Sequence, residues 1–241
     1  MPPRRGRGGI DRIDETTEPE TRPAGTVTAP PGRFGLLLLV LVGTYLMSAF
    51  SKGRLIDGLQ IVLFGGAAIL AVRNSSASRR TLRLVVLALA GGTAIMLIIS
   101  LGLATGPAGT GVTNIWTGLI LLFAVGVIVG RVLSFGTVSI QSIYGVLSAY
   151  LIIGLMFAAF YAAFDHLGGG NFFAHGQPDM TQTYQYFSFT TLTTLGYGDF
   201  TAAGNGGRAI AVLEALTGQI FLATLVARLV AAYRSPGERQ R

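Results

Sequence analysis

The sequence predicts an all-α membrane protein with six transmembrane helices, and three observations support this fold class. Apolar residues make up 51% of the 241 residues and charged residues 12%, against about 25% charged in ordinary soluble domains. Only eight charged residues lie between Phe34 and Phe164, too few to build a surface that faces water. The apolar sequence also divides into runs near the ~20 residues that cross a ~30 Å hydrocarbon core. A single soluble domain and a largely disordered chain are therefore excluded.

The six expected helices follow one another along the chain. They cover residues 34–50, 55–72, 84–104, 115–130, 143–164 and 209–233. The first and fourth runs are short, so we expect these helices to stand nearly upright or to extend into their polar flanks. The first four form a four-helix transmembrane region, 34–131.

Three less apolar segments flank these helices. Residues 1–33 are polar and rich in Pro and Gly, so we expect a disordered cytoplasmic tail. Residues 132–142 are expected to form an interfacial linker before the fifth helix. Residues 234–241 are expected to form a short cytoplasmic tail, and we expect no dedicated regulatory domain in the chain.

Basic residues predict the orientation in the membrane. If both termini are cytoplasmic, 15 of the 18 basic residues lie on the cytoplasmic side, and only Lys52, Arg54 and Arg208 lie outside. We therefore expect a multi-pass protein of the cell membrane with cytoplasmic N- and C-termini. The basic residues flank apolar runs and form no single stripe, so the expected partner is membrane lipid and not nucleic acid.

The composition argues against an enzyme. There are no Cys residues, which excludes disulfides and thiolate metal sites, and only two His residues. The sequence shows no phosphate-binding loop and no spacing typical of a catalytic triad. We expect no enzymatic activity and no organic cofactor.

The most specific motif lies between the last two expected helices. Residues 186–199 read Tyr-Phe-Ser-Phe-Thr-Thr-Leu-Thr-Thr-Leu-Gly-Tyr-Gly-Asp. The part from Thr191 to Asp199 resembles the selectivity filter of the potassium channel family, and the resemblance extends over residues 143–233. It implies an outer helix, a re-entrant pore helix at 181–192, a filter loop and an inner helix. It further implies a six-helix, one-pore bacterial-type subunit that conducts K⁺ passively.

The resemblance also implies which residues bind the ion. The backbone carbonyls of Thr194, Leu195, Gly196 and Tyr197 would bind stacked K⁺ ions, the only expected cofactor, and the Thr194 hydroxyl would add the innermost ligands. Gly196 and Gly198 permit the positive φ that such a path requires. One chain supplies a quarter of each ligand ring, so the pore is expected to be a homotetramer.

Several side chains are expected to support this filter. The pore helix directs its C-terminal end inward, where its partial negative charge favours a cation. The aromatic side chains of this helix, together with the ring of Tyr197, are expected to pack around the filter and hold its diameter. The aromatic residues of the helix are Tyr184, Tyr186, Phe187 and Phe189.

Thr191 opens the motif and Asp199 ends it. We favour an Asp199 side chain that anchors the filter through a hydrogen bond to the pore helix; the alternative is an exposed turn carboxylate at the mouth. In two-helix bacterial relatives a Glu and a Trp of the pore helix serve this network, and the corresponding residues here are Thr190 and Tyr186. This departure leaves the inactivation behaviour open.

The last helix carries two residues that need explanation. Gly218 matches the hinge glycine of the family; the alternative is close helix packing. Glu214 is a carboxylate at membrane depth, and a carboxylate in such a position is by default a candidate functional residue. Hydrogen bonding to pore-helix hydroxyls is the first expectation, and a protonated state or a place near the ion path stays open.

The fourth helix lacks the arginines of a voltage sensor. Residues 115–130 carry no charge, and Arg131 follows at the end. Each charge that crosses the field contributes about 2.3 kcal/mol per 100 mV, so we expect no steep voltage dependence. The stimulus that opens the pore and the fold of the first four helices stay open. The alternatives to a K⁺-selective channel are a weakly selective cation channel and a non-conducting partner subunit.

Overall fold

Helices dominate the structure. The computed structural model describes residues 34–50, 53–73, 79–103, 106–133 and 139–234. In these ranges the only strand-type pairing is an isolated bridge between Phe173 and Ala202. The all-α class is therefore confirmed. The helices are α1 (Phe34–Phe50), α2 (Arg54–Arg73), α3 (Arg79–Ile98), a π-helical turn (Ile99–Leu103), α4 (Pro107–Leu133), α5 (Ile140–Gly168), α6 (Thr181–Leu192) and α7 (Asn205–Arg234).

Several of these helices suit a lipid bilayer. Among the described residues, α2, α3, α4, α5 and α7 are long and apolar enough to cross a membrane. Helix α1 is apolar but has 17 residues, which at 1.5 Å per residue is about 25 Å. The apolar helices indicate a multi-pass membrane protein. Six crossings stay a prediction.

Some helices begin earlier than hydropathy predicts. Helix α4 starts at Pro107, where a proline suits the first helical position, and not at residue 115. The missed turns contain Thr110, Thr113 and Asn114, whose polarity hides them from a search for apolar runs. Helix α7 likewise starts at Asn205 and not at residue 209.

The expected linker 132–142 is shorter than predicted. Val132 and Leu133 belong to α4, and α5 begins at Ile140. Ser139 and Ser142 form a reciprocal capping box that fixes the start of α5, with the Ser142 amide donating to Ser139 Oγ at 3.2 Å. Residues 134–138 and the two expected tails, 1–33 and 235–241, lie outside the described residues.

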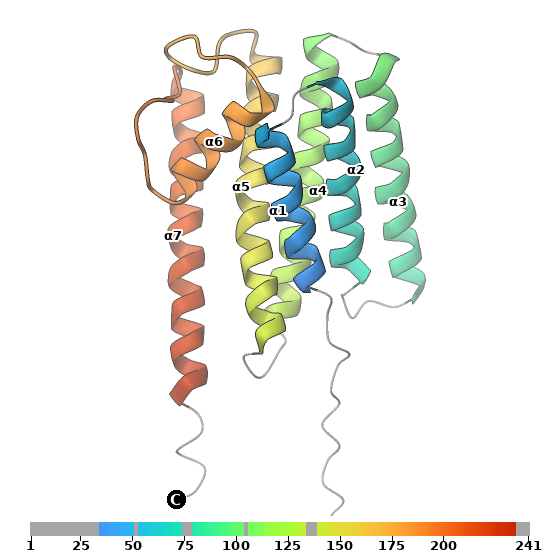
Figure 1. The fold of residues 1–241 in the computed structure, drawn as a ribbon, viewed down its shortest axis with the longest axis vertical. Coiled ribbons are helices and arrows are strands. Elements are labelled where there is room, and N and C mark those ends of the chain that lie inside the picture. The colour runs from blue at the N-terminus through green and yellow to red at the C-terminus, as the bar shows by residue number, and fades with distance from the viewer. Residues whose placement is uncertain (1–33, 51–52, 74–78, 104–105, 134–138, 235–241) are drawn as a thin grey trace, which may run out of the picture. The chain divides into compact units, whose positions relative to one another are not determined.

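Helix α5 is the central element of the described bundle (Figure 1). It packs against α1, α4, α6 and α7, and its most extensive contact is with α4. Between Ile152 and Ala163 every side chain except Phe160 is buried. Helices α2 and α3 lie farther from α7, and the N-terminal helices pack against the C-terminal helices mainly through α1 and α4.

Helix α7 is largely uncovered in the single chain. Among the described elements it packs substantially against only α5 and α6. Among its described large apolar side chains, five are more than half exposed: Val212, Leu213, Leu216, Ile220 and Val226. A contiguous apolar face of this kind requires lipid or protein contact.

Candidate functional site

The short helix α6 and the loop after it form the candidate site. Helix α6 covers the residues predicted for the pore helix and packs between α5 and α7. Its C-terminal carbonyls are satisfied by the following loop, because the Leu195 and Gly196 amides donate to the Thr190 oxygen at 2.8 and 3.1 Å. The Thr194 amide donates to the Thr191 oxygen at 3.0 Å. The loop therefore folds back over the helix end.

The backbone of this loop alternates in hand. Thr194, Gly196 and Gly198 have φ of 57°, 50° and 81°, whereas Leu195 and Tyr197 between them have negative φ. Alternation between right- and left-handed backbone directs successive peptide groups to common sides. The positive φ at the two glycines agrees with the expectation from the sequence.

Thr194 was expected from the sequence as an ion-binding residue, but its positive φ was not expected. Among the described residues it is the only non-glycine with positive φ, a conformation that costs about 1–2 kcal/mol for a residue with a Cβ. Backbone strain of this kind is concentrated at functional sites. The sequence did contain a signal for this conformation. Thr194 lies two residues before Gly196, just as Gly196 lies two residues before Gly198, so the alternation of positive φ extends back to Thr194.

The loop is open to its surroundings in the single chain. Residues 193–199 are all exposed, and Tyr197 has 69% of its side chain exposed. Within one chain the Tyr197 ring does not join the aromatic packing, and its place in an assembled pore stays a prediction. The aromatic core of this region instead consists of Tyr161, Phe172, Phe173, Tyr184 and Phe187.

The end of the loop is tied to α6 through Asp199. The Tyr186 hydroxyl donates to Asp199 Oδ2 at 2.8 Å, and the Gln177 side-chain amide donates to the Asp199 backbone oxygen at 2.7 Å. The hydrogen bond from the Tyr186 hydroxyl to the Asp199 carboxylate raises the pKa of Tyr186 to about 12, so the phenol stays a neutral donor near pH 7. The Thr190 hydroxyl takes no part, because it donates to the Phe187 oxygen of its own helix.

We expect Tyr186→Phe to shorten the lifetime of the loop that the sequence predicts to conduct ions, while leaving ion preference intact. The change removes one hydroxyl from an exposed contact and nothing from the backbone that is expected to bind ions. Current decay during long recordings measures the effect. Tyr144→Phe on α5 is the matched control, because no hydrogen bond of its hydroxyl is found among the described residues. Equal decay in both variants would contradict an anchoring role for Asp199.

A buried polar network lies on the other side of α6. Tyr161, Ser188 and Glu214 are fully buried and come from α5, α6 and α7 respectively. The Tyr161 hydroxyl donates to Glu214 Oε2 at 2.5 Å, and Ser188 Oγ lies 2.5 Å from Oε1. Ser188 also donates to the Gly154 oxygen at 2.6 Å. Glu214 thus contacts a pore-helix hydroxyl, the first of its three expected roles.

Gly218 lies against the end of α6. A Cβ added at this position would stand 2.4 Å from the Leu192 backbone oxygen, closer than real side chains approach. The same oxygen accepts a hydrogen bond from the Tyr150 hydroxyl at 3.3 Å. Close packing, the alternative interpretation of this glycine, is therefore present. Bending at Gly218 stays a prediction.

Residues 145–235 match the family model described as Ion channel. The matched range contains α6, the loop and both Glu214 and Gly218. No curated protein and no solved structure matches the chain. This part of the chain is therefore similar to an ion channel domain, and the similarity supports passive ion conduction, which is not typical of enzymes. With the apolar helices, this domain indicates a multi-pass membrane protein.

The ion channel domain also has direct contacts with the helices before it. The Ser48 hydroxyl of α1 donates to Gln185 Oε1 of α6, and the Tyr45 and Phe189 rings meet edge to face at 5.0 Å. The Thr181 hydroxyl donates to Asp57 Oδ1 of α2 at 3.4 Å. The sequence did not predict these contacts, since they join residues more than a hundred positions apart.

Proposed function

We propose that this chain is the subunit of a potassium-selective channel that conducts K⁺ passively as a homotetramer. The observation that carries the proposal is the alternating backbone of Thr194–Gly198 in a sequence that ends in Gly-Tyr-Gly-Asp. Carbonyl oxygens on one side of such a loop replace the hydration shell of a dehydrated ion. K⁺ ions would occupy sites formed by Thr194, Leu195, Gly196 and Tyr197, with the Thr194 hydroxyl innermost.

The exposure of apolar and aromatic side chains in the single chain supports the tetramer. Leu195 and Tyr197 are 52% and 69% exposed, and the apolar face of α7 is uncovered. Irregular backbone at membrane depth is tolerated only where protein buries it or water lines it. Four copies around one axis would cover both surfaces and leave the carbonyls facing a central path. In this arrangement the termini are cytoplasmic and the outer helices contact lipid in the cell membrane.

Charge supports weak voltage dependence. Helix α4 carries one charged residue, Arg131, in its last turn. Without a row of charges inside the field, opening gains little energy from a change in membrane potential.

The test is the reversal potential of the purified protein in a planar bilayer, with K⁺ on one side and Na⁺ on the other. We expect a strong displacement in the K⁺-selective direction. Gly196→Ala forces a Cβ onto a backbone with φ of 50° and should lose this displacement. Gly126→Ala is the matched control, because a Cβ there meets nothing within 4 Å.

Two other outcomes would contradict K⁺ selectivity. Clear currents that reverse near zero would support a weakly selective cation channel. A tetramer that carries no current at any tested voltage or pH, and that K⁺ does not stabilise against heat more than Na⁺ does, would support a non-conducting partner subunit.

A further inference from the structure

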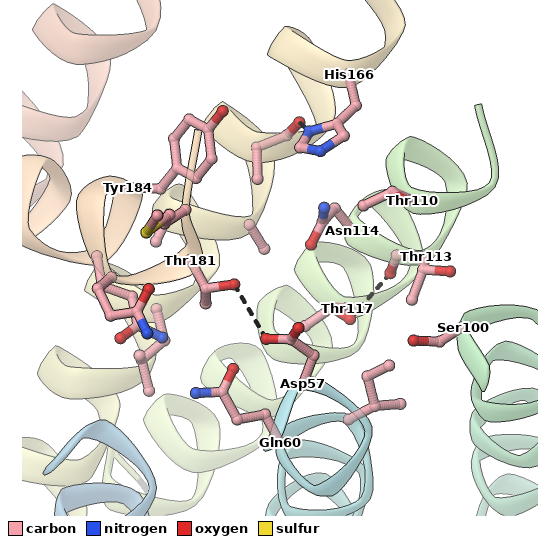
Figure 2. A pocket seen from close by; sticks show the side chains of 18 of the residues that line it. Asp57, Gln60, Ser100, Thr110, Thr113, Asn114, Thr117, His166, Thr181 and Tyr184 are labelled. Carbon is pink, nitrogen blue, oxygen red and sulfur yellow. Dashed lines mark hydrogen bonds between the residues drawn. The ribbon is translucent and has the colours of Figure 1, made fainter. Parts of the chain in front are cut away.

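A polar cavity of about 460 Å³ lies beside the N-terminal end of α6 (Figure 2). Its walls come from α2, α4, α5 and α6, and residue 100 of the turn after α3 also contributes. It is separate from the filter loop, since no residue from 193 to 199 lines it. The volume falls within the range of about 300–1,000 Å³ typical of small-molecule sites.

The sequence builds this cavity from three helix faces. Residues three and four apart share one face of a helix. Helix α2 presents Asp57, Gln60 and Phe64 in this way, and α4 presents Thr110, Thr113, Asn114 and Thr117. Helix α5 presents Ala158, Ala159 and Ala162, whose short side chains leave the space open. Polar faces of this kind in membrane-spanning helices turn inward and mark functional sites.

The interior of the cavity is polar and buried. Gln60 is only 4% exposed, and its Nε2 has no hydrogen-bond partner among the described residues. Gln60 lies one turn after Asp57, and both line the cavity (Figure 2). An unpaired buried amide is unfavourable, so an occupant that forms a hydrogen bond with it is favoured. Rotation of the amide offers that occupant either an acceptor or a donor.

Several of the remaining polar groups offer acceptors. The hydroxyls of Thr113 and Thr117 donate to carbonyls of their own helix at 2.9 Å, which leaves their oxygen lone pairs for a ligand. His166 Nδ1 lies 2.7 Å from the Ala162 oxygen. Because a carbonyl only accepts, Nδ1 of the neutral ring carries the hydrogen and Nε2 offers a lone pair.

The charge of the cavity is negative. Asp57 and Asp179 both line it and both are exposed, and among the described residues Asp57 accepts a single long hydrogen bond, from Thr181. No Lys or Arg is found among the described lining residues. The described residues also hold no group of three His, Asp or Glu side chains suited to a metal ion.

We propose that this cavity binds a small organic cation with N–H donors, such as a primary ammonium or guanidinium group. Asp57 supplies the opposite charge, and the acceptors of α4 and the Gln60 amide receive the N–H groups. Charged hydrogen bonds of this kind are about twice as strong as neutral ones. Asp57 also holds Thr181, the first residue of α6, so an occupant that engages Asp57 acts on the pore helix; this last step rests on the proposed function.

The test is isothermal titration calorimetry of the full-length protein in lipid nanodiscs, in saturating K⁺ and at constant ionic strength. The probes are ethylguanidinium and tetramethylammonium, which carry the same charge but differ in N–H donors. We expect saturable binding of ethylguanidinium and much weaker binding of tetramethylammonium. Asp57→Asn should weaken ethylguanidinium about tenfold, which equals about 1.4 kcal/mol.

Asp179→Asn is the matched control, since it removes the same charge from another exposed lining residue that does not share a helix face with Gln60, and it should cost much less. Gln60→Leu should weaken binding without changing charge. The absence of saturable binding, equal loss in the two Asn variants, or equal binding of tetramethylammonium would each overturn the proposal. Calorimetry measures binding in the cavity and does not depend on ion current. A failure of the proposed cation site can therefore be distinguished from a failure of the proposed K⁺ selectivity, which the reversal potential tests.

Discussion

Gly218→Ala is expected to abolish K⁺ preference and to lower the thermal stability of the assembled protein. The added methyl group would lie 2.4 Å from the Leu192 oxygen and 2.9 Å from Leu192 Cδ1. A backbone oxygen cannot rotate away, so α6 or α7 must shift. Overpacking of this kind costs about 1–3 kcal/mol. The shift falls two residues before Thr194, where the backbone is already strained.

The measurement is again the reversal potential between K⁺ and Na⁺, together with the melting temperature of the assembled protein. Gly126→Ala serves as the control because its Cβ meets open space in α4. If Gly218 acts as a hinge, another result is expected. Alanine would stiffen α7, so the pore would open less often but keep its full K⁺ preference. Reduced open probability with unchanged preference and melting temperature would therefore contradict the packing interpretation.

Glu214→Leu is expected to destabilise the protein strongly, whereas Glu214→Gln is expected to be tolerated. The Ser188 hydroxyl has one hydrogen and two neighbouring acceptors, the Gly154 oxygen and Glu214. A neutral carboxylic acid at Glu214 satisfies the whole network, because it donates to Ser188 while accepting from Tyr161. Glutamine reproduces this pattern with its amide. Leucine leaves the Tyr161 hydroxyl buried without a partner.

The expected cost for leucine is about 1–3 kcal/mol for the unsatisfied hydroxyl, and for glutamine less than about 1.5 kcal/mol. Thermal unfolding of the assembled protein measures both variants. Tyr161→Phe combined with Glu214→Leu should recover part of the loss, because both polar partners are then removed. Equal destabilisation by glutamine and leucine would show that charge, and not hydrogen bonding, is what the position requires.

Local signals in the sequence predict the core of the site well. The bounds of α6 follow from the motif, because the loop amides of Leu195 and Gly196 end the helix by bonding the Thr190 oxygen. The anchoring contact of Asp199 follows from the motif as well, with Tyr186 as donor and not Thr190. The left-handed Thr194 does not follow, since threonine alone disfavours this conformation.

The parts that sequence patterns did not predict depend on tertiary packing. The first turns of α4 carry polar residues that face the cavity and not lipid, so a hydropathy criterion places the helix start too late. Gln177 binds Asp199 across a loop whose path no periodicity encodes. The packing of Gly218 depends on the approach of two helices that are separated in sequence.

The contacts of α1 give the pore helix a second support from outside the matched domain. Ser48 and Tyr45 reach α6 directly, and α1 also packs along α5. Any displacement of α1 would therefore reach Gln185 and Phe189 of α6 through two side-chain contacts that do not involve α7.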